Sequence, residues 1–154
     1  MPQFSTRRRV RHSAADMFDL VADMENYPKF VPLCRDLKVR QRRRTDEGIE
    51  TALSEMTVAY KLIRETFTTR VTMDRPQMQI VVDYLHGPFS HLKNRWTFKD
   101  RDDGSCDVAF YISYEFSNRA LALLMGTMFD IAFRRFADAF ERRADQVYGR
   151  KKTG

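Results

Sequence analysis

Hydrophobic and polar residues alternate along much of the chain between residues 35 and 117, and this period of two predicts β-strands. The clearest case is residues 105–117, where Val, Phe, Ile, Tyr and Phe occupy every second position from 108 to 116. Turn-forming residues interrupt the pattern, as at Gly87-Pro88 and Asp102-Asp103-Gly104. The pattern therefore predicts six strands, over residues 35–45, 48–59, 61–74, 77–85, 91–100 and 105–117.

The two ends of the chain follow other patterns. Residues 3–12 alternate as a further strand, and Ser13 is the predicted N-cap of a short helix over residues 14–23. The segment from Tyr27 to Cys34 contains two prolines four residues apart, which exclude a long helix. Residues 118–148 carry apolar side chains at a spacing of 3.6, which predicts one long amphipathic helix capped by Asn118 or Ser117.

The predicted order is one strand, two short helices, six strands and a long helix. A seven-stranded antiparallel sheet with one long apolar helix buries that helix against the sheet. This arrangement predicts an α+β helix-grip fold, in which a seven-stranded curved antiparallel sheet wraps around the long C-terminal helix and leaves an internal cavity. We expect a single domain over residues 1–149, followed by a basic tail over residues 150–154.

The positive charge of the chain is concentrated near its beginning. The sequence has 27 Lys and Arg against 21 Asp and Glu, a net charge of +6, and residues 1–44 hold 11 of the basic and 5 of the acidic residues. If the first two strands are neighbours, alternate basic residues form one cationic wall. We expect either a solvated face that prevents edge aggregation or a surface for acidic lipid headgroups or RNA phosphates. The predicted wall consists of Arg7, Arg9, Arg11, Lys38, Arg40, Arg42 and Arg44.

Several classes of protein do not fit the sequence. The longest apolar stretch, residues 120–126, is far shorter than the ~20 residues of a membrane-spanning helix, and the N-terminus lacks the apolar region of a secretory signal. The three histidines and two cysteines show no metal-ligand spacing, and no nucleophile or phosphate-loop motif is present. We therefore expect a cytoplasmic protein without a metal, a catalytic cofactor or enzymatic activity, with Cys34 as a buried hydrophobic residue rather than a nucleophile.

Four segments resemble a known family. They are Tyr-Pro-Lys-Phe-Val-Pro-Leu-Cys at residues 27–34, and residues 64–71, 87–98 and 139–144. They are similar to the coenzyme Q-binding proteins of the START-like (polyketide cyclase/dehydrase-like, SRPBCC) superfamily, whose bacterial branch includes the ribosome association toxins. The resemblance covers residues 3–148, and Asn94 departs from it because a small residue such as glycine is expected there.

The resemblance implies a ubiquinone-binding protein that supports respiratory electron transport without catalysis, in the bacterial cytoplasm or peripheral on the inner membrane. It also leaves open an inhibitor of ribosome association that binds the large ribosomal subunit through ribosomal RNA. A polyketide cyclase is a third alternative, which the missing catalytic residues disfavour.

We expect the polyprenyl quinone between the sheet and the long helix. Glu65 alternates with apolar residues, so it is either an anchor for the head group or the partner of an arginine such as Arg95. Asn94 shares a face with Trp96 and is placed to donate to a quinone carbonyl. The predicted ligand-binding residues are Tyr27, Phe30, Val31, Glu65, Phe67, Asn94, Trp96, Tyr114, Leu121, Met125, Met128 and Phe129.

The first turn of the long helix is apolar on all sides. Leu121 and Met125 lie on its core-facing stripe, but Leu123 lies nearly opposite them. This pattern predicts either the mouth of the cavity or a lip that touches a membrane, near Phe30 and Val31. A cap packed under a neighbouring loop and a dimer contact are the alternatives.

Overall fold

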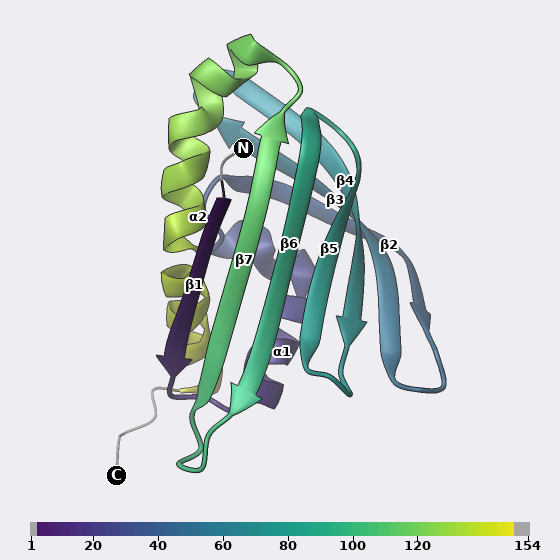
Figure 1. The fold of residues 1–154 in the computed structure, drawn as a ribbon, viewed down its shortest axis with the longest axis vertical. Coiled ribbons are helices and arrows are strands. Elements are labelled where there is room, and N and C mark those ends of the chain that lie inside the picture. Colours follow the sequence, from purple (N-terminus) through teal and green to yellow (C-terminus); the bar gives the residue numbers. More distant parts are fainter. Residues whose placement is uncertain (1–2, 150–154) are drawn as a thin grey trace.

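One curved antiparallel sheet holds a long helix across its inner face (Figure 1). The computed structural model describes residues 3–149, so the predicted basic tail lies outside the described residues. The helix-grip architecture predicted from the sequence is confirmed. The elements are β1 (Gln3–Val10), α1 (Ala14–Ala22), the 3-10 helix η1 (Met24–Lys29), β2 (Cys34–Arg44), β3 (Ile49–Tyr60), β4 (Ile63–Asp74), β5 (Gln79–His86), β6 (Phe89–Asp100), β7 (Cys106–Phe116) and α2 (Arg119–Tyr148).

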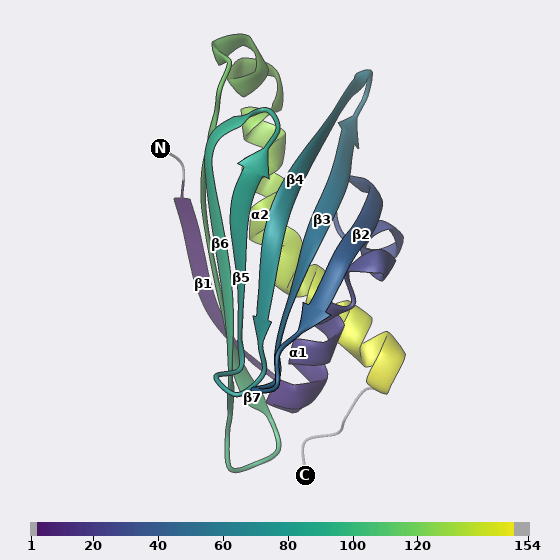
Figure 2. The same ribbon diagram turned by 90° about the vertical axis from the view of Figure 1, so that its right-hand side faces the viewer.

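The order of strands in the sheet is β1-β7-β6-β5-β4-β3-β2. Strands β2 to β7 are joined by short turns and pair with their neighbours in the chain, whereas β1 closes the far side by pairing with β7. The sheet bends around α2 (Figure 2). Helix α1 lies at the lower end of the sheet, and η1 packs beside β2. As a consequence, β1 and β2 form opposite edges of the sheet.

Helix α2 is fixed at its start and along its length. The side chain of Asn118 accepts a hydrogen bond from the Leu121 backbone nitrogen (3.1 Å), so the predicted N-cap forms. The buried face of the helix carries Met125, Phe129, Ala132, Phe133, Ala137, Phe140 and Ala144. Arg8 of β1 forms ion pairs with Asp138 and Glu141, which tie the edge strand to the helix.

An aromatic cluster lies at the end of the sheet where α2 begins. The ring of Phe89 contacts those of Phe67 (5.4 Å between centroids), Phe129 (5.9 Å) and Phe116 (4.9 Å). Gly87 has a φ of +146°, and a Cβ there would lie 2.5 Å from the Cβ of Phe67. The turn between β5 and β6 therefore requires glycine in order to close over this cluster.

None of the helices within residues 3–149 is long and apolar enough to span a bilayer.

Candidate functional site

An internal cavity of about 90 Å³ lies between the sheet and α2. Strands β3 to β7 form one wall and α2 forms the other, while η1 and the loop after it border the side. None of its lining side chains carries a formal charge at neutral pH, which favours a neutral, apolar ligand. The lining residues are Val21, Met24, Tyr27, Pro32, Leu33, Ser54, Met56, Val58, Phe67, Thr69, Val71, Ile80, Val82, Leu92, Asn94, Trp96, Ile112, Phe129, Ala132, Phe133, Phe136 and Phe140.

Two hydroxyl groups interrupt the apolar wall. Ser54 on β3 and Thr69 on β4 lie opposite each other in the sheet, and only 4% and 3% of their surfaces are exposed. Neither hydroxyl has a hydrogen-bond partner among residues 3–149. Neither residue was predicted from the sequence, although Ser54 alternates with Met56 and Thr69 with Phe67 along their strands. Both residues line the cavity, so their unpartnered hydroxyls can donate to a ligand that accepts hydrogen bonds.

Asn94 and Tyr27 are the other polar residues of the lining. Asn94 Nδ2 donates to the backbone carbonyl of Tyr111 (2.8 Å), which leaves its second amide hydrogen for another acceptor. The Tyr27 hydroxyl donates to the backbone carbonyl of Val21, and burial raises its pKa well above the usual range. Tyr27 is therefore neutral, and its hydroxyl hydrogen is already engaged.

The structure divides the predicted ligand-binding residues into two groups. Tyr27, Phe67, Asn94, Trp96 and Phe129 line the cavity. The remaining residues do not border it. This second group contains Phe30, Val31, Glu65, Tyr114, Leu121, Met125 and Met128.

Glu65 lies half-buried near the start of β4. The suggested ion pair with Arg95 is not formed, because Arg95 lies on the outer face of the sheet, 5.7 Å from the centre of the Tyr111 ring. Within the described chain, Glu65 has no ion pair at all. Its position outside the cavity lining gives no support to the predicted role as a head-group anchor.

The lip predicted near Phe30 and Val31 is wrong in its location. The ring of Phe30 packs against Phe140, 5.0 Å between centroids, in the second half of α2. Leu123 lies 17 residues earlier in the same helix, which corresponds to about 25 Å. The apolar first turn of α2 and the proline-containing segment therefore occupy different parts of the molecule.

The single cationic wall predicted from the sequence is also wrong, because its two strands lie at opposite edges of the sheet. The pattern within β2 changes as well, since the register shifts between Arg40 and Arg43 and Gln41 has a φ of +52°. Arg40 pairs with Glu55 on the outer face, whereas Arg42 binds Glu25 of η1 (2.7 Å) and Glu50 (2.5 Å) on the inner side.

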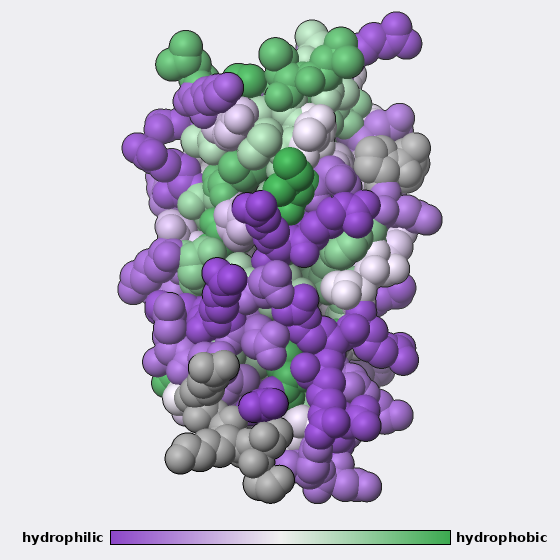
Figure 3. All heavy atoms as spheres, turned by 90° about the vertical axis from the view of Figure 1, so that its left-hand side faces the viewer, coloured by the Kyte–Doolittle hydropathy of each residue, from purple (hydrophilic) through white to green (hydrophobic). Residues whose placement is uncertain are grey.

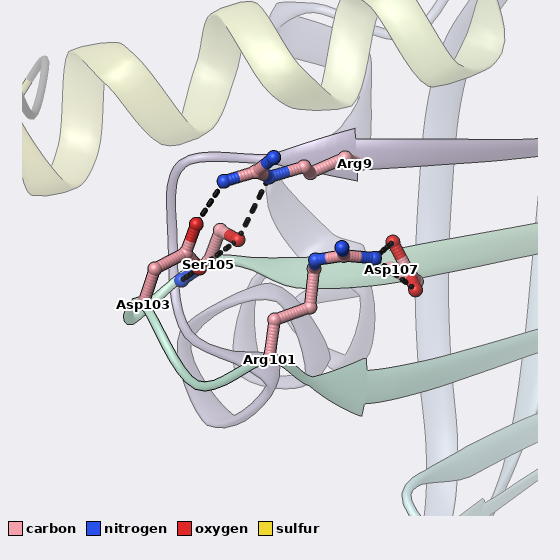
Figure 4. A network of polar contacts seen from close by, with 5 residues as sticks. All are labelled: Arg9, Arg101, Asp103, Ser105 and Asp107. Carbon is pink, nitrogen blue, oxygen red and sulfur yellow. Dashed lines mark hydrogen bonds and ion pairs between the residues drawn. The ribbon is translucent and has the colours of Figure 1, made fainter. Parts of the chain in front are cut away.

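Arg9 also has a structural role in place of a free charge (Figure 4). It forms an ion pair with Asp103, and its Nε donates to Ser105 Oγ at 3.1 Å. Asp103 in turn accepts hydrogen bonds from the backbone nitrogen (3.1 Å) and the hydroxyl (2.5 Å) of Ser105, while Arg101 pairs with Asp107 (3.1 Å). This network fixes the β6–β7 turn against β1.

The two cysteines, Cys34 and Cys106, are buried and unbonded to each other. Burial raises the pKa of each thiol to about 12, so at pH 8 the thiolate fraction is roughly a thousandth of that of a free cysteine. We expect both thiols to react with DTNB very slowly in the folded protein and rapidly in guanidinium chloride. The rate should increase as the pH approaches 12. Fast labelling of Cys34 in the folded protein at pH 8 would contradict its assignment as a buried hydrophobic residue.

Within residues 3–149, no group of three or more His, Cys, Asp or Glu side chains is arranged to hold a metal ion.

Comparison with known proteins agrees with the fold and with the apolar cavity. The profile of the family described as "Polyketide cyclase / dehydrase and lipid transport" matches residues 10–141. The chain belongs to this family. The family's description includes both enzymes and lipid-transport proteins, so membership alone leaves the choice between them open.

Three individual proteins are similar to this chain over nearly all of its length. The ribosome association toxin RatA of Vibrio cholerae is 33% identical over 149 residues, covering 97% of this chain and 99% of the toxin. The coenzyme Q-binding protein COQ10 homolog B of Xenopus laevis is 29% identical over 155 residues, covering 98% of this chain and 61% of that protein. The solution structure of an 18 kDa protein from Caulobacter crescentus is 30% identical, with a TM-score of 0.77 and coverage of 97% and 100%.

Proposed function

We propose that this chain is a non-catalytic binding protein for a polyprenyl quinone of the ubiquinone type, held between the sheet and α2 in support of respiratory electron transport. The proposal depends mainly on one observation, the apolar cavity whose lining includes two hydroxyls without hydrogen-bond partners in residues 3–149, those of Ser54 and Thr69. A quinone has only hydrogen-bond acceptors, so hydroxyl donors complement its head group. The coenzyme Q-binding relative supports the same ligand class.

The size of the cavity implies that the protein opens when it binds this ligand. Its volume of about 90 Å³ is well below the ~300 Å³ at which ordinary small-molecule sites begin. Helix α2 packs mainly on α1, β1 and β7, so it is less constrained on the side of β2 to β4. The half-buried side chains of Leu33 and Met56, which line the cavity, can also change rotamer to make room. Each methylene of the tail that is then buried contributes about 0.8 kcal/mol.

Trp96 provides a direct test. It is the only tryptophan of the chain and it lines the cavity, so its fluorescence reports on ligand entry. We expect a short-tailed ubiquinone to quench it in a saturable manner with one equivalent bound, and an organic extract of the purified protein to contain a quinone. Absence of both the bound quinone and the saturable quenching would exclude the proposal.

A second candidate function is association with the ribosome. It is supported by the names of the RatA relatives and by basic side chains on the outer face. In the part of the chain that the structure describes, Arg7, Lys38 and Arg70 have no ion pair. If these cations bind ribosomal RNA, the protein will sediment with large ribosomal subunits and its binding will weaken steeply as salt is added.

A further inference from the structure

Exposed leucines gather at one end of the molecule. Leu62, Leu123, Leu124 and Leu85 are exposed to 102%, 81%, 63% and 45%, and they are four of the five large hydrophobic residues exposed within residues 3–149. They come from the β3–β4 turn, the end of β5 and the first turns of α2. These three segments lie at the same end of the long axis (Figures 1 and 2). Figure 3 shows the apolar side chains gathered at this end, above a mainly hydrophilic face.

The fold does not require leucine at these positions. Tyr60 and Ile63 pair with each other, so Leu62 lies in a two-residue turn, where glycine, asparagine and aspartate are the usual residues. Leu123 and Leu124 are on the solvent side of α2, while Leu121 and Met125 already cover its inner side. An exposed apolar surface of this kind marks a site of contact with another molecule or with a membrane.

The basic side chains near the leucines indicate which partner this surface contacts. Residues 61–62, 85–88 and 117–124 include Lys61, His86 and Arg119 but no carboxylate, whereas Glu115 and Asp130 line a hollow beside Arg119. This composition suits anionic lipid headgroups above an apolar layer. The leucines also project from three separate tips, which a deformable lipid layer can accommodate individually.

The same end adjoins the ligand cavity. Phe67 and Phe129 line the cavity, and both contact Phe89, which stacks on Phe116 close to the start of α2. Apolar side chains therefore continue from the cavity to the exposed leucines. A hydrophobic ligand that entered here would pass from lipid into the protein without crossing water.

We infer that this end, formed by Leu62, Leu85, Leu123 and Leu124, is a lipid-docking surface. Its leucine side chains insert into the bilayer leaflet that faces the protein. The inference rests on the proposed function for its purpose, because a polyprenyl quinone resides in membranes. It replaces the predicted cationic wall as the site of membrane contact.

Vesicle sedimentation without quinone tests the docking surface. We expect the wild-type protein to bind vesicles of phosphatidylcholine with phosphatidylglycerol more strongly than vesicles of phosphatidylcholine alone. The double variant Leu62→Asp/Leu123→Asp should lower the partition coefficient at least about tenfold, because two inserted leucines are lost. Val147→Asp is the matched control, since Val147 is 49% exposed near the other end of α2 and its replacement should leave binding unchanged.

Three results would overturn the inference: no binding of the wild-type protein to either vesicle, equal binding of the double variant, or a leucine-dependent dimer that binds no vesicles. The double variant should keep its melting temperature and the quenching of Trp96 by a short-tailed ubiquinone. These readouts separate the two hypotheses, because vesicle binding without quenching would contradict only the proposed quinone function.

Discussion

Replacing Phe140 by alanine is expected to lower the free energy of unfolding by about 3–5 kcal/mol. Phe140 is 2% exposed, and its ring lies 4.9 Å from that of Trp96, 5.0 Å from that of Phe30 and 5.3 Å from that of Tyr27. The substitution removes contacts between α2, the sheet and the segment after α1 at the same time. Because this site joins three parts of the fold, the surrounding side chains cannot collapse fully into the space.

Chemical denaturation followed by far-UV circular dichroism measures this effect without depending on Trp96, whose emission the substitution will alter. Val147→Ala, on the exposed side of the same helix, is the control and should change stability by less than about 0.5 kcal/mol. A loss below about 1 kcal/mol for Phe140→Ala would mean that α2 does not pack on the sheet as described.

The local elements could be predicted from the sequence because local patterns determine them. Both predicted helix caps form, since the Ser13 hydroxyl accepts from the Asp16 backbone nitrogen as Asn118 does from Leu121. Alternation over residues 105–117 defined β7, and turn residues such as those at 102–104 placed its start within one residue. These signals depend only on neighbours in the chain.

The arrangement of charge could not be predicted in the same way. The order of strands places β1 and β2 far apart, and no pattern within either strand records its partner. The bulge in β2 depends on a positive φ at Gln41, a residue type that gives no such signal. Because a shift of one residue reverses the face of each later side chain, Arg42 turns inward while Arg40 remains outside.

The residues that line the cavity could be predicted only in part, for a related reason. Helical spacing identifies the face of α2 but not the depth at which each residue meets the cavity. Leu121, Met125 and Phe129 share a face, yet only Phe129 borders the cavity, because the first turns of α2 extend past the aromatic cluster. Ser54 and Thr69 were missed because a single polar residue on an apolar face gives a weak signal.

Filling the cavity should separate ligand binding from stability. Ser54→Leu replaces a hydroxyl of the cavity lining with an isopropyl group that projects into about 90 Å³ of space. We expect the affinity for a short-tailed ubiquinone, measured by Trp96 quenching, to fall at least about tenfold, because the group blocks the head-group position and one donor is lost. Stability should stay the same or rise by at most about 2 kcal/mol, the value of filling such a space.

Two variants complete this test. Ser5→Leu makes the same change at an exposed position of β1 and should leave quinone affinity unaltered. Thr69→Val removes the opposite hydroxyl without adding bulk, so it should weaken binding only about two- to tenfold, the range of one hydrogen bond. If Ser54→Leu folds normally and still binds ubiquinone with wild-type affinity, the ligand occupies another surface. The space between the sheet and α2 would then be an ordinary packing defect.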